Sequence, residues 1–368
     1  MLNGVKIIEF EGVGPGPFAG MHLADLGAEV IVVNRPGKPK TPGIPERQIL
    51  DRGKRSIELD LKNPKHIGIA KALVAQSDGL IEGLRPGVME RLGLGPDVCA
   101  EINPALMYGR MTGWGQSGTM ARQAGHDLNY VSMSGAAWYA SEPGAAPFTP
   151  PTLLGDIGGG ALYLVIGLLS GILRARETGK GCVVDAAILD GSAHMMNLLM
   201  TLRQSDGMSP QRGKSLLDGS HWSRSYQTSD GGFMSVQCLE AQFYADFLRL
   251  LGEDQNPELA NQYDPELWPR QTEIVAAIFK SRTRAEWEAV FAGSDACTAP
   301  VLSPDEALKY QHRMGRTIWR DHEGVLQAAA APRFSDQPDW QVPDVPSRGG
   351  DTRAILSELG IDPGDWAT

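Results

Sequence analysis

The sequence of 368 residues predicts an α/β fold: a large, doubly wound (Rossmann-like) parallel-sheet domain followed by a smaller α+β domain. Apolar segments typical of buried parallel strands alternate with helical segments over the first 200 residues. Near residue 203 the chain becomes polar and rich in Gly and Ser. We therefore expect a large domain at 1–202, a linker at 203–230 and a small domain at 231–324, with the tail 325–368 completing the large domain.

The first strand–helix–strand unit is the clearest part of this pattern. VKIIEF (5–10) reads as the first strand, FAGMHLADLGA (18–28) as a helix and AEVIVVNRPG (28–37) as the second strand. The intervening turn, GVGPGP, does not match the dinucleotide fingerprint GxGxxG, and Pro15 and Pro17 remove two N–H groups that a pyrophosphate would use. A ligand site is still expected at the carboxyl ends of these strands.

The charge and composition of the chain argue against one class of function and leave another open. The net charge of −10 argues against a nucleic-acid-binding protein. Basic residues nevertheless crowd the first 55 positions, and such a patch fits either a phosphorylated small ligand or a solvated loop. The basic residues are Arg35, Lys38, Lys40, Arg47, Arg52, Lys54 and Arg55.

Cysteine usage and the apolar segments bear on localisation. The four cysteines, Cys99, Cys182, Cys238 and Cys297, are scattered and form no CxxC motif, so we expect reduced thiols in a cytoplasmic protein and no metal site. Met1 is followed almost directly by a strand, which leaves no room for a signal peptide. The apolar run 157–173 is shorter than the roughly 20 residues of a membrane span. We expect a buried helix there and no membrane association.

The stretch 124–176 contains the two candidate catalytic residues. It contains His126 within AGHDLNY (124–130) and Asp156 within LLGD (153–156), each at the start of a helical stretch. The loop between them is long enough to bring the two side chains together. An imidazole and a carboxyl group facing each other suit proton transfer to and from carbon. Either residue could instead have an ordinary structural role, His126 as a satisfied histidine and Asp156 as a helix N-cap.

These motifs resemble the α-methylacyl-CoA racemase group within the family III CoA-transferase (CaiB/BaiF-like) superfamily. The resemblance covers the first 200 residues almost without a gap and continues weakly at 216–219, 239–244 and 294–302. The strongest segments are VGPGPFAGMHLADLGAEVIVVNRPG (13–37), RGKRSIELDLK (52–62), EGLRPGVMERLGLGP (82–96), GRMTGWGQSG (109–118), AGHDLNY (124–130), LLGDIGGG (153–160) and GKGCVVDAAILDG (179–191). It implies an interlocked homodimer with active sites shared between chains, acyl-CoA thioester substrates and no cofactor.

Carried over by position, the resemblance implies that His126 and Asp156 are the acid/base pair and that Glu240 pairs with the histidine. Glu240 could instead be an ordinary carboxylate in the first turn of a helix. The implied coenzyme A contacts are Arg35, Leu59, Asp60, Leu61, Lys62, Arg85, Arg91, Gly125, Asp127, Leu128, Asn129 and Tyr130.

The implied reaction inverts the α-carbon of a 2-methylacyl-CoA thioester through an enolate. Two groups in opposite protonation states are needed, so the pKa of Asp156 must rise. One alternative is a family III CoA-transferase that uses Asp156 as a nucleophile; such enzymes generally lack a histidine at position 126. Another is a non-catalytic acyl-CoA-binding protein, which would need no acid/base pair.

One segment departs from the racemase pattern. LDGSHWSRSYQT (217–228) replaces the usual run that follows LDG, in a region where the acyl chain is expected to enter. We expect His221, Trp222 and Arg224 to line a pocket there that accepts a polar or aromatic acyl group.

Overall fold

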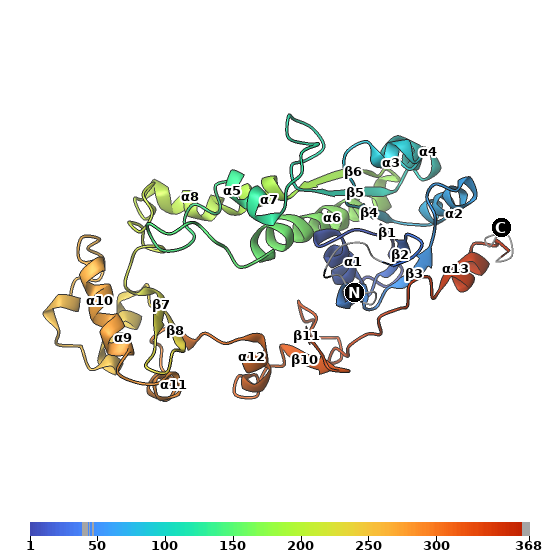
Figure 1. The fold of residues 1–368 in the computed structure, drawn as a ribbon. Helices are drawn as coiled ribbons and strands as arrows, with labels where there is room; N and C mark the ends of the chain where they lie inside the picture. The colour runs from blue at the N-terminus through green and yellow to red at the C-terminus, as the bar shows by residue number, and fades with distance from the viewer. Residues whose placement is uncertain (39–42, 44, 46–47, 363–368) are drawn as a thin grey trace. The chain divides into compact units, whose positions relative to one another are not determined.

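The computed structural model describes residues 1–38, 43, 45 and 48–362. The chain forms two compact units (Figure 1). Unit 1 contains Met1–Ala136, Thr149–Met195 and the described part of 320–368, and unit 2 contains Ala137–Phe148 and Met196–Trp319. This division differs from the predicted one in two respects. Residues 137–148 belong to unit 2, and so does the predicted linker at 203–230, which contributes a strand to its sheet.

Unit 1 is built on a six-stranded sheet in the order β3-β2-β1-β4-β5-β6. All neighbouring strands pair in parallel, as the alternation of apolar and helical segments predicts. The order reverses direction between β1 and β4, which is the switch point of a doubly wound fold. The strands are β1 (Lys6–Phe10), β2 (Glu29–Asn34), β3 (Arg55–Glu58), β4 (Gly79–Glu82), β5 (Met107–Thr112) and β6 (Cys182–Ala187).

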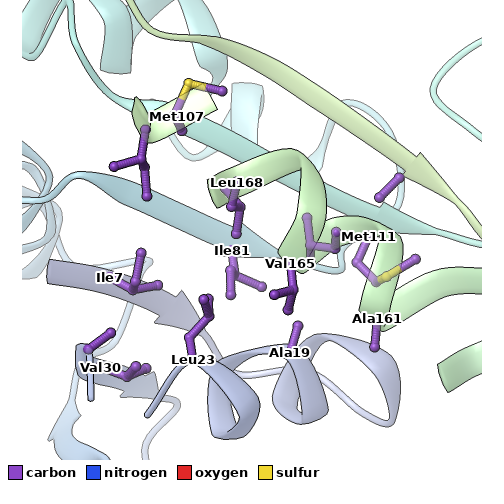
Figure 2. Close-up of a cluster of buried hydrophobic side chains, with 14 of the residues drawn as sticks. Ile7, Ala19, Leu23, Val30, Ile81, Met107, Met111, Ala161, Val165 and Leu168 are labelled. Atoms are coloured by element: carbon purple, nitrogen blue, oxygen red, sulfur yellow. The ribbon is translucent and has the colours of Figure 1, made fainter. Parts of the chain in front are cut away.

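Helices cover both faces of this sheet, which explains why its strands are apolar on both sides. On one face α1 (Pro15–Asp25) and α6 (Leu162–Thr178) bury a cluster with Ile7, Leu23 and Leu168 (Figure 2). On the other, α2 (Pro64–Ala75), α4 (Pro96–Ile102) and α13 (Thr352–Glu358) pack against residues such as Ile8 and Ile57. The remaining helical segments of unit 1 are η1 (Ile49–Asp51), α3 (Val88–Arg91), α5 (Asp127–Met133), the π-helix η2 (Leu153–Ala161) and α7 (Ile188–Met195).

Local signals in the sequence mark one end each of two helices of unit 1. Asn63 caps α2, because its side chain accepts a hydrogen bond from the N–H of Lys65, and Pro64 occupies the first helical position. α6 ends at Gly179 in the left-handed conformation.

The apolar run 157–173 is only half buried in the chain, so the expectation of a buried helix is corrected. Leu164, Leu168 and Ile172 face the core, whereas Ile166 and Leu173 are 59% and 68% exposed. Among the described residues, the continuous helix Leu153–Thr178 alone is long and apolar enough to cross a membrane, with a mean hydropathy of 1.7. Core helices of soluble proteins pass the same test, so this is weak evidence for a span.

Unit 2 contains the antiparallel sheet β7-β8-β9 and an aromatic core that includes Trp222, Tyr226 and Phe279. Its elements are α8 (Asn197–Gln204), β7 (Ser223–Gln227), β8 (Phe233–Gln237), α9 (Ala241–Leu251), η3 (Pro257–Leu259), α10 (Trp268–Phe279), α11 (Arg284–Phe291), β9 (Thr298–Pro300) and α12 (Pro304–Tyr310). After α12 the chain forms the two-stranded sheet of β10 (Trp319–His322) and β11 (Val325–Ala328).

The segment 217–228 does not form the pocket that its sequence suggested. His221 and Trp222 are both fully buried in the core of unit 2. The Nε1 atom of Trp222 donates to the Gln262 carbonyl, while Arg224 donates to Thr272 and pairs with Glu142. Two of the three proposed acyl-binding residues are thus structural, and the expectation of a polar acyl pocket made by them is wrong.

The basic segment is also largely structural. Arg52 pairs with Asp25 at 2.6 Å, Lys54 pairs with buried Glu9 at 2.7 Å, and Arg55 pairs with Glu29 and Glu358. Lys40 and Arg47 lie outside the described residues. Because Arg52, Lys54 and Arg55 already have carboxylate partners, they do not form an open phosphate-binding patch.

His221 makes the stability of unit 2 sensitive to pH. Its Nε2 atom lies 2.7 Å from the Tyr244 hydroxyl, which itself donates to the Leu259 carbonyl at 2.7 Å. The neutral ring therefore donates through Nε2. Burial, assisted by the positive charge of Arg224, lowers the pKa of His221 to about 4.

Because the unfolded chain binds a proton at His221 below about pH 6.5 and the folded chain does not, unfolding should become easier as the pH falls from 6.5 toward 4. Between pH 6.5 and 5 the wild-type chain should lose about 1.5 kcal/mol more of its apparent free energy of unfolding than His221→Phe. Urea titrations at each pH measure this difference. Equal losses in the two proteins would contradict it.

Candidate active site

A cavity of about 340 Å³ opens at the carboxyl edge of the unit 1 sheet. It lies beside the ends of β1, β4 and β5, where the strand order reverses and where doubly wound folds bind ligands. Its wall includes the turn after β1, the loop after β4, the loop after β5 and the start of α5. The residues that bear on its chemistry are Gly14, Pro15, Pro17, Arg85, Trp114, Gly125, His126, Tyr130 and Asp156.

His126 is placed at the edge of the cavity by the start of α5. Its backbone is extended, it occupies the N-cap position, and its N–H donates to the Asn129 side chain at 3.0 Å. Its carbonyl accepts from the N–H of Asn129 at 2.8 Å, which closes the first turn of the helix. The side chain is exposed in unit 1 and is thus accessible to a ligand.

Asp156 lies in the first turns of the π-helix η2 and lines the same cavity. Its N–H donates to Asp127 Oδ1 at 2.8 Å, so the segment that carries Asp156 is tied directly to α5. Gly155 makes this approach possible, because a Cβ there would lie 2.4 Å from Asp127 Oδ1 and 2.6 Å from Val131 Cγ2. π-Helical segments occur frequently at functional sites.

The environment of Asp156 favours its protonated form. Burial raises its pKa to about 6, and the negative charge of Asp127 adds to this rise, while His126 opposes it. The cavity thus holds a carboxyl group that titrates close to neutral pH beside an imidazole. Such a pair can exchange protons with a substrate in either direction.

Two aromatic residues hold the loop that precedes His126. The Tyr130 hydroxyl donates to the Gly125 carbonyl, and the Trp114 and Tyr130 rings meet edge to face with centroids 4.7 Å apart. A Cβ at Gly125 would lie 2.8 Å from the Tyr130 ring and 2.9 Å from Trp114, so only glycine fits. Burial and the charge of Asp156 raise the pKa of Tyr130, which keeps this donor protonated.

The loop after β4 presents Arg85 to the cavity. Buried Glu82 fixes the start of this loop by accepting from the Leu84 N–H at 2.7 Å and from Arg110 Nε at 2.9 Å. Arg110 also reaches Glu90 at 2.8 Å, on the far side of the loop. The ion pairs therefore brace both ends of the loop and leave Arg85 exposed at the cavity wall.

The predicted residues divide into groups in the structure. Arg85, Gly125, His126, Tyr130 and Asp156 line one cavity. The other predicted residues of unit 1 lie outside its lining: Arg35, Leu59, Asp60, Leu61, Lys62, Arg91, Asp127, Leu128 and Asn129.

The residues outside the lining differ in exposure. Leu59 is fully buried in the sheet core, whereas Arg35, Lys62 and Arg91 are exposed. Asp60 organises the turn before α2 by accepting from the Lys62 N–H. These placements leave their roles toward coenzyme A as predictions.

Glu240 belongs to unit 2, where it precedes α9 as the N-cap residue with no cap hydrogen bond from its side chain. Its pairing with His126 stays a prediction. Among the described residues no group of three or more His, Cys, Asp or Glu side chains is arranged to hold a metal ion.

Sequence reasoning missed Trp114 and the turn at 12–17 as parts of the cavity wall. A Cβ built on Gly14 would lie 3.5 Å from Asp156 Oδ2, so this turn borders the carboxyl group directly. The unusual GVGPGP sequence could have indicated that this turn belongs to the cavity wall. Pro15 and Pro17 cannot donate backbone hydrogen bonds to the carboxylate, which fits a group whose neutral form is favoured.

Comparison with known proteins identifies the family. The sequence matches CoA-transferase family III over residues 2–352. The chain belongs to CoA-transferase family III. It is 39% identical to "Alpha-methylacyl-CoA racemase" of Mus musculus and 37% identical to that of Homo sapiens, covering 98% of this chain and 94% of each relative. The predicted resemblance and the prediction that the chain is an enzyme of the isomerase class are confirmed.

Other relatives of the chain have a different activity in their names. The chain is 28% identical to "Succinyl-CoA:glutarate CoA-transferase" of Mus musculus over 97% of its length and 86% of that protein. Among solved structures, a CAIB/BAIF family protein from Brucella suis superposes with a TM-score of 0.79 at 26% identity, covering 97% of this chain and 98% of the other. The predicted α/β fold is confirmed.

Gly155 provides a test of the contact between η2 and α5. Gly155→Ala should destabilise the protein by about 1–3 kcal/mol, because the new methyl group overlaps Asp127 and Val131. Gly158→Ala is the matched control in the same π-helix, since its Cβ would lie no closer than 3.3 Å to any neighbour. Denaturant titration compares the two variants. If the Gly158 variant were destabilised as much as the Gly155 variant, the contact would not be the tight one described.

Proposed function

We propose that this member of CoA-transferase family III is a racemase that inverts the α-carbon of 2-methylacyl-CoA thioesters. The observation that carries the proposal is the presence of His126 and Asp156 on one cavity, with the pKa of Asp156 raised to about 6. The identity of 37–39% to α-methylacyl-CoA racemases over nearly the whole chain supports it. We further propose that the reaction needs no cofactor, because proton transfer can be completed by these two side chains.

The proposed reaction proceeds by proton transfer on opposite faces of the α-carbon. In one direction neutral His126 removes the α-proton and protonated Asp156 delivers a proton to the other face. In the reverse direction the Asp156 carboxylate removes the proton and the His126 imidazolium delivers one. Each turnover leaves the pair with one proton in total, so inversion needs no external acid or base.

The intermediate enolate needs stabilisation of its oxygen, because a thioester α-proton is far less acidic than either side chain. The start of α5 is the proposed source, since the N–H groups of Asp127 and Leu128 precede the first hydrogen bond of the helix, which the Asn129 N–H makes to the His126 carbonyl. The turn Gly125–His126 brings this helix end to the cavity wall. The hydrogen bond from Tyr130 to the Gly125 carbonyl holds the turn in place.

Coenzyme A binding is proposed on the same unit. Arg85 lines the cavity, and Arg35, Lys62 and Arg91 are exposed cations elsewhere on unit 1. Phosphate groups bind Arg and Lys through charge-assisted hydrogen bonds. Of these four residues, Arg85 is the one that the cavity geometry supports directly.

We also propose a homodimer in which Glu240 of the partner subunit pairs with His126. Support comes from Leu162, Ile166 and Leu173, exposed apolar residues at helical spacing on α6 that a second subunit could cover. A carboxylate beside His126 would hold the ring in one tautomer and stabilise its charged form.

The alternative is a CoA-transferase in which the carboxylate of Asp156 attacks an acyl-CoA. Identity to succinyl-CoA transferases favours keeping it as a candidate, since the chemistry also needs a carboxylate in the cavity. Nucleophilic attack by Asp156 does not use an imidazole, however, whereas inversion uses the His126 side chain that lines the same cavity. This difference makes racemisation the better supported function.

The proposal predicts the outcome of incubating (2R)- and (2S)-2-methylacyl-CoA in D₂O. Both epimers should take up deuterium at the α-carbon and converge on one mixture, followed by NMR and chiral analysis. His126→Ala and Asp156→Asn should each reduce the rate by at least about 10²-fold, because either change removes one proton-transfer group.

His22→Ala serves as the control, because this histidine lies on α1 outside the cavity lining. Its rate should match that of the wild type. Transfer of coenzyme A to an added carboxylate such as succinate, dependent on Asp156 and without α-deuterium exchange, would replace the proposal with the transferase alternative.

A further inference from the structure

The side chain of Asp127, on α5, makes a direct hydrogen bond to the backbone of the segment that carries Asp156. It follows His126 in the sequence, is 7% exposed and does not line the cavity. Its Oδ1 atom accepts the N–H of Asp156 at 2.8 Å. A buried carboxylate is costly unless it is hydrogen-bonded, so its position between the two acid/base residues calls for an explanation.

The contact determines how closely two separate elements approach. Asp127 is on α5, whereas Asp156 is on η2, 29 residues further along the chain. Gly155 allows the approach, because any larger residue would overlap Asp127 Oδ1. One hydrogen bond thus joins the backbone of Asp156 to the residue next to His126.

Asp127 also acts on Asp156 through its charge. Apart from burial, Asp127 and His126 are the groups that shift the pKa of Asp156, upward and downward respectively. Tyr130 of α5 and Arg85 share the cavity. None of the titratable residues on the other elements packed against η2 is among the causes of this shift. They are His22 and Asp25 on α1, Tyr108 and Arg110 on β5, Tyr163, Arg174, Arg176 and Glu177 on α6, Cys182 and Asp185 on β6, and Asp190 and His194 on α7.

We propose that Asp127 is a positioning residue whose carboxylate holds Asp156 at its working distance from His126. The inference rests on the proposed racemase function. Through its charge, Asp127 also makes the proton on Asp156 easier to retain. The ordinary alternative is that Asp127 only stabilises the N-terminus of α5.

Two substitutions separate the hydrogen bond from the charge. Asp127→Asn keeps an acceptor oxygen at Oδ1 and removes the charge, whereas Asp127→Ala removes both. Asp97→Asn is the control, because Asp97 also occupies the first turn of a seven-residue helix, α4, away from the cavity. Racemisation of 2-methylacyl-CoA is measured from pH 4.5 to 9 in all four proteins, with thermal unfolding recorded in parallel.

Asp127→Ala should lower kcat by about tenfold or more while KM changes by less than about threefold, because positioning acts on the chemical step. Asp127→Asn should recover most of this kcat. In the pH profile of kcat/KM for Asp127→Asn, the acidic limb should move to lower pH by about half a unit. The reason is that the pKa of Asp156 falls when the neighbouring charge is removed. Asp97→Asn should match the wild type.

The result that overturns the inference is an Asp127→Asn profile that superimposes on that of the wild type, together with a kcat of Asp127→Ala that falls only in proportion to lost folded protein. That outcome would assign Asp127 to helix stability alone.

Carboxyl-carbon NMR of selectively labelled aspartate tests the same point without activity. The Asp156 signal, assigned with Asp156→Asn, should titrate at lower pH in Asp127→Asn than in the wild type. An unchanged midpoint would contradict the role of the charge. A wild type that neither racemises nor exchanges would instead refute the proposed function, and the titration would still decide the inference.

Discussion

The cavity depends on the place where the sheet reverses its strand order. Because β1 and β4 are neighbours, the chain leaves their carboxyl ends in opposite directions, and the connecting segments cannot cover the edge between them. The turn after β1 and the loop after β4 form two walls of the opening, and α5 and η2 bring His126 and Asp156 to it. His126 and Asp156 therefore lie at an edge that the topology itself leaves open.

Electrostatics at this edge serve two separate purposes. The ion pair of Glu82 with Arg110 holds the loop after β4 and shapes the cavity without lining it. Asp156 differs, because it is partly buried, forms no ion pair with any described Lys or Arg, and lies beside another acid. A pair of interacting acids in such a site places its proton affinity near neutral pH, as proton transfer to carbon requires.

The sequence was sufficient to predict the parallel sheet of unit 1, because apolar β-rich segments and helix caps are local signals. His126 and Asp156 could be singled out because each stands at the start of a helical stretch and matches the racemase group by position. The π-helical form of η2 and the contact between Asp127 and the Asp156 N–H could not, because they arise from packing between elements distant in sequence. For the segment with His221 and Trp222, the prediction from the sequence was wrong. Its polar composition suggested a linker and a pocket, although tertiary burial and hydrogen bonds to Tyr244 and Gln262 place both residues in a core.

The central claim is that two different groups exchange protons on opposite faces of one carbon. Single-epimer racemisation in D₂O at low conversion tests it most directly, with mass analysis of the separated epimers. The account predicts that the product epimer carries deuterium from the first turnovers while the recovered substrate retains its hydrogen. Product that instead retains the substrate's hydrogen would show that one group moves the same proton across both faces, and this would contradict the account.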